Sequence, residues 1–194
     1  VMQRYADAGL TAVVAPEIEF YLTAAHTDPA QALVPPPGRS GRVEVGQSAF
    51  SMGALNELAP FWDEFHATLD ALGIGADTWL HEVGTTQFEI NLLHGDPLHV
   101  ADQAFVFKMA AKEVALKHRL NAVFMAKPIA GEAGSSMHLH QSVVDAAGHV
   151  ASDLASVLEK GGYAIVAEVV AGHEGLDARD FAHVGDDLRE HFDN

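Results

Sequence analysis

The sequence predicts an α+β fold in which helices flank an antiparallel, curved sheet. The 194 residues are 48% hydrophobic and 20% charged, the composition of a globular chain long enough to bury a core. Segments with the two-residue period of strands stand before, between and after segments with the helical period. The strand segments carry polar side chains on one face and apolar side chains on the other, which favours a sheet covered on one side.

The first element is a predicted strand over residues 11–22. It begins with β-branched residues and then alternates, so that Glu17 and Glu19 fall on the same face. Residues 23–47 follow, with Pro29, the run Pro-Pro-Pro-Gly at 35–38 and a further glycine at 41. We expect a long loop here, and a loop of this length inside a compact domain is often functional.

A helical period replaces the strand period from Met52 onward. Ser51 is a plausible N-cap, Gly73 a plausible stop, and Pro60 is expected to bend or restart the helix. Apolar side chains recur at steps of three and four, the pattern of an amphipathic helix: Leu55, Leu58, Trp62, Phe65, Leu69 and Leu72.

A pair of strands and a second helix come next. Residues 76–93 predict the strand pair, with Phe88, Ile90 and Leu92 facing the core. Asp96 and Pro97 provide a cap and a first helical residue for a helix that we expect to run to about residue 120. Its buried side is predicted to consist of Val100, Ala104, Phe107, Ala111, Val114 and Ala115.

Two further strand-like segments lie at 121–127 and 135–144, and the chain then changes character. Residues 1–150 carry 17 acids and 8 bases, a net charge of −9, whereas residues 151–194 carry 10 acids and 3 bases, a net charge of −7. We therefore expect two regions, a folded unit over 1–150 and an acidic, largely helical tail over 151–194, with helical segments at 153–160 and 177–192 around an apolar run at 163–170.

Charge and composition exclude several classes of function. A net charge of −16 repels phosphate backbones and anionic lipids, so a partner made of nucleic acid or membrane is not expected. The chain has no cysteine, which excludes disulfides and thiolate sites and makes the cytoplasm the expected location. The first residues have neither the basic flank nor the apolar stretch of a secretory signal, and no apolar run approaches the length of a transmembrane helix.

Three polar clusters lie on the predicted strands. They are Glu17 with Glu19, His81 and Glu82 with the Gln-Phe-Glu run at 87–89, and His138 with His140. The last pair shares its strand face with Ser136 and Ser142. Carboxylates crowded on one sheet face repel one another unless they are protonated or bind cations. Oxygen-rich sites with an imidazole suit Mg²⁺ or Mn²⁺. Taken singly, an E-x-E strand is more often a solvent-facing edge, and an H-x-H pair is more often polar surface.

The order of these motifs resembles the catalytic domain of the glutamine synthetase family. The resemblance covers residues 5–150 and rests on PEIEF at 16–20, HEVGTTQFEI at 81–90, Ala-Asp at 101–102, Phe-Lys at 107–108, FMAKP at 124–128 and GSSMHLHQS at 134–142. A finer resemblance is to the γ-glutamylpolyamine and γ-glutamylputrescine synthetase branch. It rests on GRSGR at 38–42, EIN at 89–91, HGD at 94–96 and ALKH at 115–118, with MHLHQS at 137–142.

The resemblance implies an ATP-dependent ligase that joins the γ-carboxylate of glutamate to ammonia or to a polyamine such as putrescine, through a γ-glutamyl phosphate. It implies two Mg²⁺ or Mn²⁺ sites, with Glu19, Glu82 and Glu89 at one and Glu17 and His138 at the other. Glu89 and His138 become the catalytic candidates, and Glu19, Gly134 and His138 the candidates for contact with glutamate. His140 and Ser142 match positions near the nucleotide, whereas Ala133 stands where the family has asparagine.

Two departures from the family pattern lead us to expect an incomplete fragment. The family places a small β-grasp domain before this region, and a neighbouring subunit's copy completes each site of a ring homo-oligomer. The second catalytic half of the family carries arginines for phosphate and glutamate. The basic residues of 151–194 are only Lys160, Arg179 and Arg189, and none of them matches those arginines. Two alternatives stay open: a non-catalytic module that binds metal or nucleotide, and a metal-dependent hydrolase that uses His138 and His140 as paired ligands.

Overall fold

A computed structural model describes residues 2–28, 30–46 and 49–148. In chain order the elements are α1 (Met2–Asp7), β1 (Leu10–Ala24), α2 (Met52–Glu57), α3 (Ala59–Leu72), β2 (Ala76–His81), β3 (Gln87–Leu92), α4 (Pro97–Lys117), β4 (Leu120–Val123) and β5 (Met137–Asp145). The predicted segments of the tail, at 153–160, 163–170 and 177–192, lie outside the described residues.

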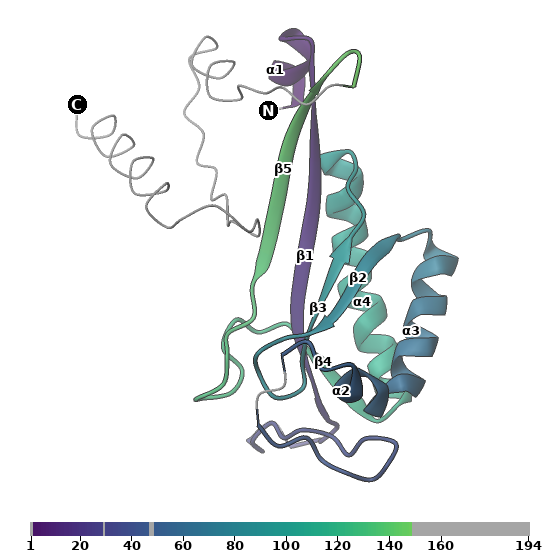
Figure 1. The fold of residues 1–194 in the computed structure, drawn as a ribbon, viewed down its shortest axis with the longest axis vertical. Coiled ribbons are helices and arrows are strands. Elements are labelled where there is room, and N and C mark those ends of the chain that lie inside the picture. The colour runs from purple at the N-terminus through teal and green to yellow at the C-terminus, as the bar shows by residue number, and fades with distance from the viewer. Residues whose placement is uncertain (1, 29, 47–48, 149–194) are drawn as a thin grey trace, which may run out of the picture.

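The five strands form one antiparallel sheet built around β1, as predicted from the sequence (Figure 1). One edge of β1 pairs with β3, which in turn pairs with β2. The other edge pairs with β5 over residues 10–18 and with β4 over residues 21–24. β1 therefore borders every strand of the sheet except β2, and its side chains reach the neighbours on both edges.

The hydrophobic core lies between the sheet and the helices α3 and α4. The sheet contributes alternate residues of β1 and β3, among them Phe20 and Phe88, which are 0% exposed. Phe65 of α3 and Phe107 of α4 are equally buried, and their ring centroids lie 5.2 Å apart. Each fully buried side chain of this size contributes roughly 1.5–3 kcal/mol. The opposite face of the sheet keeps the polar residues.

The helix boundaries follow the predicted signals. The Ser51 hydroxyl accepts a hydrogen bond from the backbone N–H of Ala54, and Gly73 ends α3 with a φ of 70°. Pro60 restarts the helix, because it lies in the first turn of α3, where its missing N–H costs nothing. The predicted helix cap, helix end and helix restart are thus confirmed at Ser51, Gly73 and Pro60.

Two boundaries differ from the prediction. The helix that was expected to reach residue 120 ends at Lys117, because Arg119 has a φ of 59° and turns the chain into β4. The strand expected over 121–127 is only Leu120–Val123. Beyond it, Ala126 O accepts a hydrogen bond from Ser135 N, so this stretch forms the base of a loop instead of extending the strand. The short helix α1 was not predicted.

Candidate metal centre

Strand register brings the polar motifs together on the sheet face opposite the helices. Glu19 of β1 is directly opposite Glu89 of β3, and Glu17 of β1 is directly opposite His138 of β5. Residues directly opposite in antiparallel strands have Cβ atoms only about 4.5–5.5 Å apart. Three clusters that are far apart in sequence thus meet around β1.

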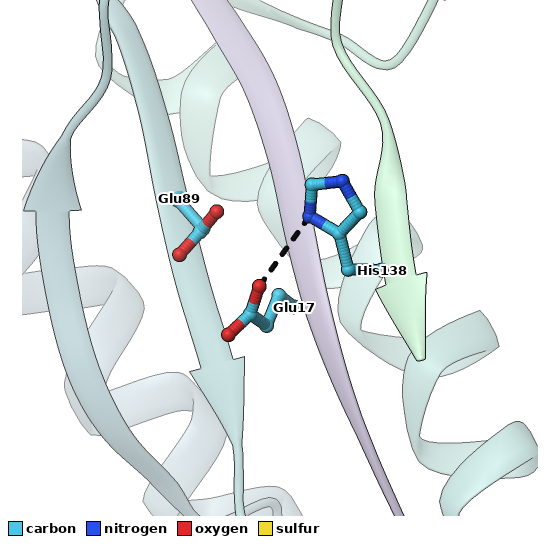
Figure 2. Close-up of side chains that lie close together, drawn as sticks. All are labelled: Glu17, Glu89 and His138. Atoms are coloured by element: carbon cyan, nitrogen blue, oxygen red, sulfur yellow. Dashed lines mark ion pairs between the residues drawn. The ribbon is translucent and has the colours of Figure 1, made fainter. Parts of the chain in front are cut away.

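Glu17, Glu89 and His138 form the tightest group, which we call the ligand trio. Each offers one ligand atom, and these atoms all lie within 4.8 Å of one another. Figure 2 shows the trio on three neighbouring strands, with His138 Nδ1 3.4 Å from Glu17 Oε2. Among the described residues, this is the group of carboxylates and imidazoles whose spacing suits a metal ion.

Glu19 lies beside the trio but is already held by hydrogen bonds. Its Oε1 accepts from the Ser136 hydroxyl at 2.7 Å, and its Oε2 accepts from Ser136 N at 3.2 Å and from Gln87 Nε2 at 3.1 Å. Glu19 Oε1 also lies 3.8 Å from His138 Nδ1. These contacts orient the Glu19 carboxylate toward the trio.

Gln87, a member of the second polar cluster, holds Glu19 in place, a role that its residue type did not indicate. Its amide nitrogen also donates to the Gly134 carbonyl, at 2.8 Å, and its amide oxygen accepts from Gly84 N, at 2.9 Å. The strand alternation predicted a polar position, but Gln87 is 0% exposed because it lies beneath the segment that carries Gly134 and Ser135. Only the tertiary fold shows this contact.

Electrostatic crowding is strongest at Glu89, which is 7% exposed. Burial, followed by the charges of Glu17, Glu82 and Glu19, raises the pKa of Glu89 to about 7. The Oδ1 atom of nearby Asn91 is buried without a hydrogen-bond partner, while its amide nitrogen donates to Glu17. Crowded carboxylates, one imidazole and an unpaired carbonyl oxygen form a donor set that fits Mg²⁺ or Mn²⁺.

Glu82 follows β2 and is not part of the trio. Its Oε2 accepts from Val83 N at 3.1 Å, and its charge contributes to the raised pKa of Glu89. His81 fixes the backbone here: it is 0% exposed, and its Nδ1 lies 2.7 Å from the carbonyl oxygen of Glu82. The other ring nitrogen of His81, Nε2, lies 3.0 Å from Glu44 Oε1. The Glu44 carboxylate also accepts a hydrogen bond from Thr86 N. Glu44 lies in the loop of residues 23–47, but no motif distinguished it there.

The remaining predicted residues lie around the trio. His140 Nε2 is 2.7 Å from Glu17 Oε1, and both His140 and Ser142 line a shallow hollow with Val13 and His94. Gly134 is connected to Glu19 through Gln87. The trio contains one imidazole, whereas the hydrolase alternative requires His138 and His140 on the same metal ion.

Comparison with known proteins identifies what the chain is similar to. Residues 1–172 match the family described as the catalytic domain of glutamine synthetase, beyond residue 150 where we expected the resemblance to end. Over 144 residues the chain is 38% identical to the γ-glutamylputrescine synthetase PuuA of Escherichia coli, and over 146 residues it is 34% identical to a glutamine synthetase of Mycolicibacterium smegmatis. Over 148 residues it is 34% identical to a glutamate–isopropylamine ligase of Pseudomonas.

These matches cover 73–76% of this chain but only 30–32% of each relative. The solved structure of a GmaS/ADP complex superimposes with a TM-score of 0.63 and 30% identity, over 77% of this chain and 33% of that one. The α+β architecture is therefore shared with these proteins. None of the described helices combines the length and the apolar character needed to cross a membrane.

Proposed function

The chain belongs to the glutamine synthetase family, and we propose that it carries the metal-binding part of a site that joins the γ-carboxylate of glutamate to an amine with cleavage of ATP. The observation that carries this proposal is the ligand trio. Glu17, Glu89 and His138 meet from three strands, and the family resemblance gives each of them a metal-binding role. An accidental surface cluster would not combine this convergence with a buried carboxylate.

The family resemblance implies two adjacent cation sites around the trio. Glu19, Glu82 and Glu89 would hold one Mg²⁺ or Mn²⁺, and Glu17 and His138 would hold the other. Bound cations of this kind neutralise the charge of a phosphoryl group during transfer. The trio contains members of both sets, which supports two sites that are close together.

Neighbouring side chains hold the proposed metal ligands in place. Ser136 and Gln87 hold Glu19 in place, and His81 with Glu44 fixes the backbone that carries Glu82. Glu89 must lose the proton that its raised pKa retains before it can bind a cation. His140 and Ser142 would contact the nucleotide from their hollow, and Gly134 would contact glutamate.

The proposed reaction has two displacements. The glutamate γ-carboxylate attacks the terminal phosphorus of ATP and releases ADP, and the amine then attacks the resulting acyl phosphate and releases inorganic phosphate. The named relatives differ in their amines, from putrescine to isopropylamine. We therefore propose ammonia or a polyamine such as putrescine as the second substrate. The family resemblance also supports a ring homo-oligomer in the cytoplasm for the whole protein.

We further propose that the 194-residue chain has little ligase activity by itself. The chain spans about 30% of the length of the curated relatives that it matches. The resemblance gives no phosphate-clamping role to the basic residues of 151–194, and such an arginine is worth about 10³–10⁵ in rate in other phosphoryl-transfer enzymes. Metal binding by the chain can therefore be tested separately from ligase turnover.

Isothermal titration of Mn²⁺ into the purified chain, with and without ATP, tests the binding. We expect saturable binding that weakens at least tenfold in Glu89→Ala and His138→Ala, because each variant removes a ligand. Glu113→Ala, an exposed carboxylate of α4, is the matched control and should leave binding unchanged.

Phosphate release from ATP in the presence of glutamate and putrescine tests turnover in the same samples. Glutamate- and amine-dependent release would show that the chain is a complete ligase and would overturn the proposal of low activity. Metal binding with no release by the chain or by a longer polypeptide containing it would favour the non-catalytic module. Absence of saturable Mn²⁺ binding would contradict the proposed metal site.

A further inference from the structure

Helix α4 carries a stripe of large apolar side chains on its outer face. Leu98, Phe105, Met109 and Leu116 are 67%, 68%, 55% and 58% exposed. Their steps of seven, four and seven place them on one side of the helix. The opposite side of α4, including Phe107 and Val114, is buried against the core. Large apolar groups aligned on an exposed helix face are typical of an interaction surface.

Two charged residues lie on the same side of α4 and, together with the four apolar residues, form a heptad pattern. Asp102 lies between Leu98 and Phe105, and Lys112 lies between Met109 and Leu116. Both are exposed. The six positions are then separated by alternating steps of four and three, the spacing at which helices pair along a seam. We call these six residues the α4 seam: Leu98, Asp102, Phe105, Met109, Lys112 and Leu116.

We propose that the α4 seam is an interface between two copies of this chain, with their α4 helices antiparallel. A two-fold axis on the outer face of α4, midway between Phe105 and Met109, brings Leu98 to Leu116 of the partner subunit and Phe105 to Met109 of the partner subunit. The same axis brings Asp102 to Lys112 of the partner subunit. The seam is thus complementary to itself in both shape and charge, as a two-fold interface requires.

The charges also specify the direction of pairing. In a parallel pair, Asp102 would face Asp102 of the partner subunit and Lys112 would face Lys112 of the partner subunit, and like charges across a helix interface are unfavourable. The antiparallel pair replaces both repulsions with attractions. It also brings Lys108 near its own copy, but Lys108 is not one of the six seam residues, and its ammonium lies beside the seam, 5.8 Å from the centroid of the Phe124 ring.

The seam is long enough for a stable contact. From Leu98 to Leu116 the helix rises about 27 Å at ~1.5 Å per residue. Lys112 also lies 5.8 Å from the Phe124 ring centroid, and its four-carbon stem lets the ammonium reach across the interface instead. The inference is independent of the proposed ligase function, because α4 presents this seam on the side away from the sheet that carries the ligand trio.

Sedimentation velocity of the 194-residue chain over a range of concentrations tests the interface. We expect a monomer–dimer equilibrium that Phe105→Ser shifts to monomer, while the circular dichroism spectrum stays unchanged because Phe105 is exposed. A chain that is monomeric at every concentration overturns the proposal. So does a dimer that Phe105→Ser leaves intact, because its interface would lie elsewhere.

A charge exchange tests the direction. Asp102→Lys alone should raise the dimer dissociation constant about tenfold, because two attractive contacts become repulsive. The double variant Asp102→Lys, Lys112→Asp should restore dimerisation, since the exchanged charges again face opposite signs. Asp70→Lys on α3 makes the same change in net charge and is the matched control. Failure of the double variant to restore dimers contradicts antiparallel pairing.

The absence of cysteine from the sequence allows a direct geometric test. A mixture of the Leu98→Cys and Leu116→Cys variants should form a disulfide-linked heterodimer under mild oxidation, and neither variant should cross-link efficiently alone. Cross-linking of Leu98→Cys with itself would show parallel pairing and overturn the proposal.

Discussion

At the scale of single residues, the account depends on Glu89, a carboxyl surrounded by other carboxylates. Its pKa is raised to about 7 from 4.5, so between these values the folded chain holds a proton that the unfolded chain has released. The free energy of unfolding that Glu89 contributes must therefore fall as pH rises from 4.5 to 7. A shift of this size corresponds to about 3 kcal/mol as an upper bound.

Glu89→Gln should remove this dependence, because the amide stands in for the protonated carboxyl. We expect the variant to be more stable than the wild type at pH 8, by about 1–3 kcal/mol, and similar to it at pH 4. Urea unfolding with a chelator at several pH values measures the difference. Glu113→Gln is the exposed control. Equal pH slopes for wild type and Glu89→Gln would contradict the raised pKa.

Gly84 is a second residue whose identity the site requires. A Cβ at this position would clash with the Tyr21 hydroxyl, which donates to the Ala133 carbonyl beside the site. Gly84→Ala should therefore destabilise the chain by about 1–3 kcal/mol. Gly53→Ala on α2 is the matched control, because its Cβ would meet only Ser51 Oγ, at 3.6 Å. Thermal unfolding of both variants measures the contrast, and equal midpoints would show that the site tolerates a Cβ here.

We expect Glu44 to position the backbone that carries Glu82. It pairs with buried His81, whose other ring nitrogen faces the backbone of Glu82. Glu44→Ala leaves the Nε2 atom of His81 unpaired, which should cost about 1–3 kcal/mol of stability. It should also weaken Mn²⁺ binding, while Glu44→Gln should retain most of both. Calorimetry on the two variants separates loss of charge from loss of the hydrogen bond. Full Mn²⁺ affinity in Glu44→Ala would contradict the positioning role.

At the scale of elements, several helices begin or end at local signals in the sequence. Asp96 is the clearest case, since its carboxylate accepts from Leu98 N and His99 N at the start of α4. Asp96→Ala should lower the free energy of unfolding by about 1 kcal/mol. Asp96→Asn should keep most of that stability, because an amide oxygen can accept the same bonds. Urea unfolding distinguishes these outcomes, and equal losses in both variants would exclude a capping role.

Local signals also explain how much of the fold was predictable. The E-x-E alternation placed Glu17 and Glu19 on one face of β1, and Pro60 and Gly73 set the bounds of α3. The end of α4 was missed because the left-handed conformation of Arg119 has no signature in residue type. The strand expected to reach residue 127 was too long because a tertiary hydrogen bond, from Ser135 to Ala126, determines the loop.

At the scale of the whole molecule, the sheet register is what turns three separated motifs into one site. The motifs could be found in the sequence because carboxylates and imidazoles at strand spacing are chemically distinctive. Glu44 could not be found in this way, and Gln87 could be placed in a polar cluster but given no role. Their contacts, with His81 and Gly134, are with residues remote in sequence. The family resemblance implies metal-binding roles for Glu17, Glu89 and His138, and the structure brings their ligand atoms within 4.8 Å of one another.

The central claim is that Glu17, Glu89 and His138 bind divalent cations at two adjacent sites. The most direct measurement is an anomalous difference map from a crystal of the chain soaked in Mn²⁺ above pH 7, where Glu89 is ionised. We predict one peak within about 2.0–2.6 Å of a Glu89 carboxylate oxygen and a second within the same distance of Glu17 and His138, and loss of the first peak in Glu89→Ala. A map with no peak at the trio, or with Mn²⁺ bound only elsewhere, would contradict it.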